Sequence, residues 1–234
     1  MIKPTIHSRT PTPAPLANAA GRARARGFTL LETSMALVII GVGVLAFVEA
    51  QKSFMQNNNW SSQAATGSYL ANEIREYVRG LPRHDPVTGL YLGGENGTTL
   101  FGWGMEDGEA GAVDIDDIDD LDGVVFGAGG TFQGPINAFG EVVPAITIDG
   151  VEIQRQDGTP ESLDGWTQTV HVEKVDPLNF GTVRGNAYFE APSGNFAGRS
   201  VDQFPLRVTV IVRYHGPLDA EPTEISRTVW IVPP

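Results

Sequence analysis

The chain has 234 residues, a length that suits one domain with a short appendage. Its 16 Lys and Arg residues against 28 Asp and Glu residues leave a formal net charge of −12. This balance argues against nucleic acid as a partner, because phosphate backbones are bound by clustered basic side chains. The lack of cysteine in the sequence excludes disulfides, thiolate metal sites and thiol nucleophiles.

The charges are unevenly distributed along the chain. Residues 1–27 contain five Lys and Arg residues and no acid. Residues 84–154 contain 14 Asp and Glu residues and neither Lys nor Arg. The remaining parts are nearly balanced, so we expect three regions with different roles.

The basic start is typical of a targeting segment. Residues 1–21 are rich in proline and are expected to be disordered, and Arg22, Arg24 and Arg26 follow them. The apolar run at 28–48 would be about 30 Å long as a helix, which is the thickness of a bilayer core. Arginines on its N-terminal side predict that this end stays in the cytoplasm and that the rest of the chain crosses the membrane.

One acidic residue, Glu32, lies inside the apolar run. A carboxylate at the centre of a membrane helix costs about 2.5 to 3.5 kcal/mol on insertion scales, so such a group usually has a partner and a function. If the chain is cut after Gly27, the new amino group of Phe28 lies four residues before Glu32. That amine, from the same chain or from a neighbouring helix, would be a suitable partner.

The sequence Arg-Gly-Phe-Thr-Leu-Leu-Glu at 26–32, followed by the apolar run, resembles the type IV prepilin signature of pilins, minor pilins and pseudopilins. The resemblance covers about 30 residues. It implies that prepilin peptidase cuts between Gly27 and Phe28 and methylates the amine of Phe28. It also implies that Glu32 docks the subunit onto other pilin or pseudopilin subunits during assembly.

Two other interpretations of the N-terminus remain open: an ordinary secretory signal peptide and a plain membrane anchor. Val48-Glu49-Ala50 offers small residues of the kind that a signal peptidase recognises, and cleavage there would leave Gln51 as the first residue. Neither interpretation gives Glu32 a role.

The helical pattern continues beyond the apolar run. No proline occurs between Pro15 and Pro82, and apolar residues recur at helical spacing up to Leu81. We therefore expect one helix over 28 to about 79, with a transmembrane and assembly part at 28–50 and a continuation at 51–80. Gly67 is a point where this helix could bend.

The globular domain at 81–234 is expected to end in a sheet. Alternation of side chains predicts strands at 166–175, 206–214 and 225–232, and the segments 142–148 and 151–154 flank Asp149-Gly150 as in a tight hairpin. The predicted class is α+β, pilin-like: a long N-terminal helix with a C-terminal antiparallel β-sheet.

The acidic region at 84–154 contains 15 glycines and is expected to be mostly loop. Six aspartates lie within ten of its residues: Asp114, Asp116, Asp117, Asp119, Asp120 and Asp122. Crowded carboxylates repel one another unless a cation neutralises them, and oxygen-only ligands suit Ca²⁺. The spacing of Ile115, Ile118 and Leu121 equally permits a short helical turn with a solvated acidic face. Both interpretations remain open.

The element Asp-Asp-Ile-Asp-Asp-Leu-Asp-Gly at 116–123 resembles the D-type minor pilin of the mannose-sensitive haemagglutinin (MSHA) pilus operon. No catalytic residues are expected, because the histidines are isolated and no nucleophile motif occurs. The sequence thus predicts a non-enzymatic minor pilin or pseudopilin of a type IV pilus or type II secretion-like filament. It would be anchored in the inner membrane with a periplasmic domain before assembly. The alternative is an anchored periplasmic binding or enzymatic domain with a prepilin-like leader.

Overall fold

The computed structural model describes residues 29–234. The chain divides into two compact units, one ending at Ser53 and the other running from Phe54 to Pro234. Helix α1 (Leu30–Val78) begins in the first unit and ends in the second. The leader at 1–27 and the predicted cut between Gly27 and Phe28 lie outside the described residues.

Helix α1 follows the sequence prediction closely. At its start, the side-chain oxygen of Thr29 accepts a hydrogen bond from the main-chain N–H of Glu32 at 3.2 Å, as in an N-cap. Its end at Val78 precedes Leu81 and Pro82, where a proline disfavours helical backbone in the residue before it. The predicted long helix is confirmed over the residues that the structure describes.

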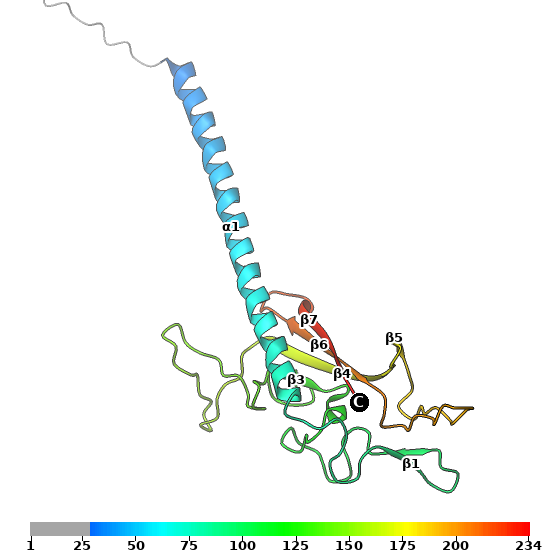
Figure 1. Ribbon diagram of the computed structural model, residues 1–234. Helices are drawn as coiled ribbons and strands as arrows, with labels where there is room; N and C mark the ends of the chain where they lie inside the picture. The colour runs from blue at the N-terminus through cyan, green and yellow to red at the C-terminus, as the bar shows by residue number, and fades with distance from the viewer. Residues whose placement is uncertain (1–28) are drawn as a thin grey trace, which may run out of the picture. The chain divides into compact units, whose positions relative to one another are not determined.

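The second unit contains a five-stranded antiparallel sheet built around β4 (Trp166–Asp176), β6 (Leu206–Tyr214) and β7 (Thr223–Val232). These three strands run side by side (Figure 1). The short strand β3 (Val125–Gly127) pairs with one end of β4, and β5 (Asn179–Val183) pairs with the other. The three predicted C-terminal strands and the α+β class are confirmed.

One face of the sheet packs against the second half of α1. Leu70, Ala71, Ile74 and Val78 on the helix belong to one apolar core with residues of β4 and β6. This spacing of three or four residues places them on one side of the helix. Alternate residues of β4 face the same core, so the period-two pattern of the sequence is explained by burial.

Gly67 lies where α1 packs closely against β7. A β-carbon built on Gly67 would be 2.6 Å from Cγ2 of Ile225, which is closer than packed atoms allow. The helix is continuous through this residue. The lack of a side chain at Gly67 therefore serves helix–sheet packing, and a bend of the helix at this residue stays a prediction.

Residues 79–165 consist mainly of turns, as predicted. They contain the hairpin of β1 (Tyr91–Gly93) and β2 (Thr99–Phe101), a 3₁₀ turn η1 (Asp119–Leu121) and β3. The turn at Asp149-Gly150 is present, with the N–H of Gly150 bonded to the oxygen of Thr147 at 2.9 Å. Its flanks pair as in the predicted hairpin, since the N–H of Thr147 bonds to the oxygen of Val151 and the N–H of Ile153 to the oxygen of Ala145, both at 2.8 Å. The pairing consists of isolated bridges, so continuous strands at 142–148 and 151–154 do not form. Ile148 is fully exposed and has no apolar face to bury.

Candidate functional site

The N-terminal part of α1 presents its side chains to the surroundings. Every residue from 29 to 53 is exposed. The helix is long and apolar enough to cross a membrane. Such a helix needs either lipid or other helices to cover it, because exposed apolar surface of this extent is unfavourable in water.

Glu32 is exposed within this apolar part. Its predicted partner is the amine of Phe28, which together with Gly27 lies outside the described residues. The roles of Gly27, Phe28 and Glu32 in processing and assembly therefore remain predictions.

The aspartate-rich segment is drawn into the core of the second unit. Ile115, Ile118 and Leu121 are buried there. The N–H of Ile118 donates to the oxygen of Pro82, and the N–H of Gly123 donates to the oxygen of Val170, both at 3.0 Å. These contacts fix the segment between the end of α1 and strand β4.

This anchoring buries acidic side chains as well. Asp117 and Asp119 are fully buried, and Asp120 is 3% exposed. The expected short helical turn is present as η1, but the interpretation of its acidic residues as a solvated surface is wrong. Carboxylates rarely occupy such positions without a partner, so each of them calls for an explanation.

Three of the six aspartates have their own hydrogen-bonding roles. Asp114 accepts hydrogen bonds from the N–H groups of residues 110 and 111, and Asp122 accepts one from the N–H of Val172 at 3.0 Å. Asp119 accepts the N–H of Gly104 at 3.1 Å and contacts Nδ1 of His84 at 2.8 Å. Their carboxylates therefore act within loops and between segments.

Asp117 accepts the N–H of Asp120 at 3.0 Å, Asp120 accepts the N–H of Asp116 at 3.1 Å, and both aspartates also lie in a cluster with Glu106. One carboxylate oxygen from each of the three residues lies within 4.8 Å of the others, and we call this set the carboxylate cluster. Oδ2 of Asp117, Oδ1 of Asp120 and both carboxylate oxygens of Glu106 are buried without a hydrogen-bond partner. Asp120 also belongs to a second group with Glu109 and the exposed Asp116.

Burial strongly perturbs the protonation of this cluster. Burial, reinforced by the charge of Asp120, raises the pKa of Glu106 to about 8. Burial, reinforced by the charge of Asp119, raises the pKa of Asp117 to about 8. The charged forms of these groups are therefore disfavoured when no cation is bound.

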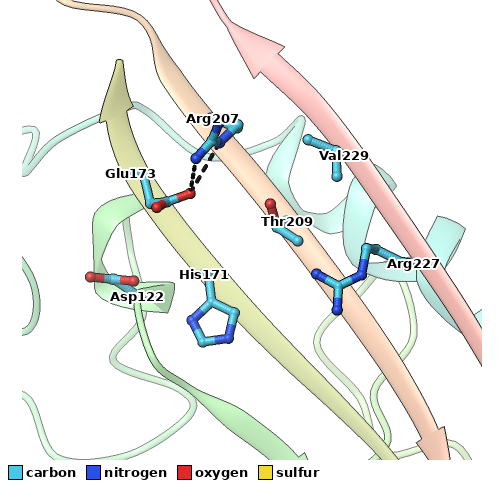
Figure 2. Close-up of a pocket in the computed structure, with 7 residues that line it drawn as sticks. All are labelled: Asp122, His171, Glu173, Arg207, Thr209, Arg227 and Val229. Carbon is cyan, nitrogen blue, oxygen red and sulfur yellow. Dashed lines mark hydrogen bonds and ion pairs between the residues drawn. The ribbon is translucent and has the colours of Figure 1, made fainter. Parts of the chain in front are cut away.

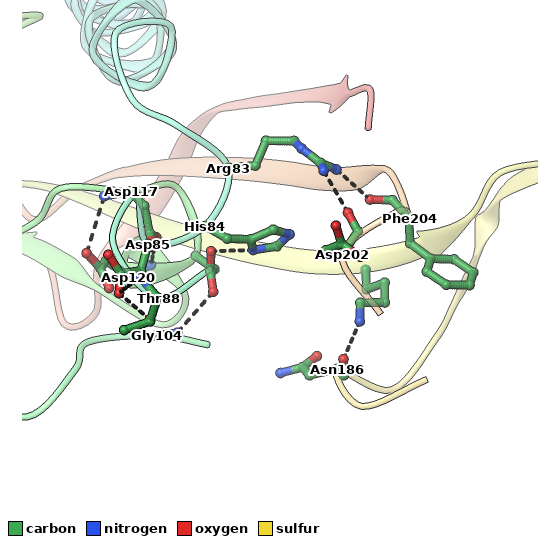
Figure 3. A network of polar contacts seen from close by, with 12 residues as sticks. Arg83, His84, Asp85, Thr88, Gly104, Asp117, Asp120, Asn186, Asp202 and Phe204 are labelled. Carbon is green, nitrogen blue, oxygen red and sulfur yellow. Dashed lines mark hydrogen bonds and ion pairs between the residues drawn. The ribbon is translucent and has the colours of Figure 1, made fainter. Parts of the chain in front are cut away.

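A network of basic side chains adjoins Asp119 through His84. Figure 3 shows its members Arg83 and His84 beside Asp202 and Phe204. Arg83 donates hydrogen bonds to the main-chain oxygens of Asp202 and Phe204, at 2.6 and 3.0 Å. The fully buried Lys174 donates to the main-chain oxygen of Asn186. These bonds tie the chain after α1, strand β4 and the loop before β6 together.

His84 belongs to the same network and is buried. Burial, with the neighbouring charge of Arg83, lowers the pKa of His84 to about 4, so its ring is neutral near pH 7. His84 is isolated from the other histidines in the sequence, yet it is buried in this network and is not a surface residue. Its partner Asp119 is 35 residues away in sequence, so the spacing of histidines in the sequence carries no signal of the contact.

The surface of the sheet carries an open hollow over the outer face of β4, β6 and β7 (Figure 2). Glu173 and Arg207 form an ion pair there at 2.8 Å, and His171 projects from β4 beside it. His171 is exposed, as expected for a strand histidine. The hollow carries charges of both signs on a regular sheet surface.

The comparisons with known proteins bear on the N-terminus. Residues 22–48 match a family described as "Prokaryotic N-terminal methylation motif". This part of the chain is type IV prepilin-like. Neither the curated proteins nor the solved structures contain a match to the chain. The coarse resemblance is thus supported, while the resemblance to the D-type MSHA subunit remains a prediction.

The sequence did not single out Glu106 as a cluster member. It lies outside the ten-residue aspartate run and is separated from it by Gly108 and Gly111. The only available signal was the absence of Lys and Arg from the whole region at 84–154. Turns at the glycines bring Glu106 back toward Asp117 and Asp120, and such a return cannot be deduced from local spacing.

Proposed function

We propose that this chain is a minor pilin or pseudopilin, a structural or priming subunit of a type IV pilus or related filament. The observation that carries the proposal is the methylation motif at 22–48, which ends within an exposed helix of membrane-spanning character. The motif implies processing by prepilin peptidase and assembly with other pilins. Proteins with this motif serve as structural subunits, and we assign no catalytic residues.

Before assembly, the apolar part of α1 would hold the subunit in the inner membrane. Arg22, Arg24 and Arg26 favour a cytoplasmic N-terminus, and hence a periplasmic position for the residues after the span. The fit to a membrane-anchored pilin rests on the motif and the helix together. In a filament, equivalent helices would replace lipid around the same apolar surface.

The amine of Phe28 supplies a partner for Glu32 in this proposal. Cleavage after Gly27 creates that amine, and a staggered neighbouring subunit brings it to the carboxylate. Pairing the two charges offsets the cost of holding a carboxylate in an apolar environment. The D-type minor pilin of an MSHA pilus is the finer assignment that we propose, on the basis of the Asp-rich element at 116–123.

The test is mass spectrometry of the N-terminus, combined with purification of surface filaments from cells that express the chain. We expect a mature chain that begins with methylated Phe28 and that copurifies with filaments at a low ratio to the main subunit. A mature chain that begins at Gln51 would contradict the proposal. A chain cut at Phe28 that never enters filaments would favour an anchored periplasmic domain instead.

A further inference from the structure

Protein groups alone do not provide hydrogen-bond partners for all buried oxygens of the carboxylate cluster. Asp117 is fully buried and Asp120 nearly so, yet each keeps one carboxylate oxygen without a hydrogen-bond partner. Both oxygens of Glu106 are buried and unpartnered as well. Buried polar atoms almost always have a partner, so four such oxygens in one cluster point to a missing ligand.

Within residues 29–234, no basic side chain forms an ion pair with Glu106, Asp117 or Asp120. The nearby basic groups are used elsewhere, since Arg83 and Lys174 bond to main-chain oxygens of other segments. A cation from solution would supply the positive charge that the protein does not provide when these carboxylates are ionised.

We propose that Glu106, Asp117 and Asp120 bind a divalent cation, with calcium preferred. Calcium takes oxygen ligands at about 2.3 to 2.6 Å, so two oxygens on opposite sides of the ion lie about 5 Å apart. The carboxylate oxygens of the cluster lie within 4.8 Å of one another, which meets this requirement. Magnesium demands near-octahedral geometry and keeps several waters, and it is seldom held by an all-protein set of carboxylates.

The second acidic group extends the site toward the surface. It shares Asp120 with the cluster and adds Glu109 and the exposed Asp116. Calcium takes about six to eight ligands, so water would complete the shell of an ion held by the cluster. Glu109 and Asp116 also offer the ion a path from solvent to the buried residues.

The proposed set differs from the six aspartates that the sequence suggested. Asp114, Asp119 and Asp122 are left out because neither group of clustered carboxylates includes them and none of them keeps a buried oxygen without a partner. Glu106 joins the set from outside the aspartate run. The bound ion would link the loop that carries Glu106 to the turn η1, which is anchored on β4.

The proposal is tested on the purified full-length chain in detergent, by isothermal titration calorimetry and thermal unfolding with CaCl₂ or EGTA. We expect saturable calcium binding and a midpoint temperature higher by about 4 °C or more in calcium than in EGTA. Glu106→Gln and Asp120→Asn should each weaken calcium binding by about tenfold or more. Asp114→Asn is the matched control and should keep the calcium response.

The isosteric variants also separate loss of binding from loss of folding. Asp117→Asn replaces a buried carboxyl group by a neutral amide of the same shape, so the variant should unfold in EGTA at the same or a higher temperature than the parent chain and should no longer respond to calcium. The proposal is overturned if the parent chain shows no binding heat and the same unfolding midpoint in calcium and EGTA. A response to MgCl₂ without a response to CaCl₂ would overturn the choice of calcium.

Discussion

The side-chain amide of Gln168 on β4 donates a hydrogen bond to the main-chain oxygen of Leu70 on α1, 2.9 Å away. The same amide nitrogen donates to the oxygen of Ile136 at 3.0 Å, and the side-chain oxygen of Gln168 accepts the N–H of Ile136 at 2.7 Å. One buried side chain thus joins the helix, the sheet and the loop that precedes β4. The alternation of β4 placed Gln168 on the core-facing side, and these bonds explain how a polar residue is tolerated there.

Replacing Gln168 by Met is expected to lower the free energy of unfolding by about 2 kcal/mol, because the buried N–H of Ile136 loses its acceptor. The change keeps the length of the side chain. Urea unfolding followed by circular dichroism measures the effect. Gln133→Met at an exposed position outside the apolar core is the control, and equal stability of the two variants would disprove the role of Gln168.

Gly67→Ala is expected to destabilise the fold, although alanine favours helix by about 1 kcal/mol. The new methyl group would meet Cγ2 of Ile225 at 2.6 Å, and overpacking of this kind typically costs about 1 to 3 kcal/mol. Thermal unfolding is the measurement. Gly80→Ala should be neutral, because its nearest added contact is 3.5 Å away.

A second change should rescue the first. Ile225→Ala removes the side-chain atom that the methyl group added at position 67 would strike. The double variant should therefore be more stable than the sum of the two single effects predicts. Additive effects would show that the close approach of α1 and β7 is not the cause.

Lys174 is expected to make stability depend on pH above neutrality. Burial lowers the pKa of Lys174 to about 8 from 10.5. Asp119 and Asp202 act in the opposite direction, and Arg83 adds to the lowering. Between pH 8 and 10.5 the unfolded chain keeps a proton that the folded chain has lost, so the free energy of unfolding rises with pH.

The rise attributable to Lys174 between about pH 8 and about pH 10 is about 2 kcal/mol. Lys174→Met should remove it, while Lys52→Met at an exposed position should leave it intact. Urea unfolding at the two pH values provides the comparison. An unchanged rise in the Lys174 variant would mean that other groups produce it.

Glu32→Ala is expected to leave processing and domain stability intact and to abolish incorporation into filaments. Glu32 is exposed and lies in the unit that ends at Ser53, so the core of the second unit does not depend on it. Immunoblotting of sheared filaments, with thermal unfolding of the purified chain, separates the two effects. The control is Glu49→Ala in the same helix, and normal incorporation of the Glu32 variant would refute the docking role.

The regular elements were largely predictable from local patterns. Helix α1 and strands β4, β6 and β7 follow from apolar spacing, because burial of one face imposes a period of about 3.6 or 2 residues. Residues 142–154 show the limit of this reasoning. They alternate like strands and pair around the turn, yet Ile146, Ile148 and Val151 stay exposed and the pairing is limited to isolated bridges.

The sequence by itself determined the motif at 22–48, the apolar helix with Glu32, the α+β class and the concentration of acid in one loop region. Only the tertiary structure decided which carboxylates are buried, which of them are satisfied, and that Glu106 joins Asp117 and Asp120. It also decided that Gly67 serves helix–sheet packing and that His84 contacts Asp119. The physical reason is that burial of a loop residue depends on contacts between distant segments, such as Ile118 with Pro82 and Gly123 with Val170, and no local period records them.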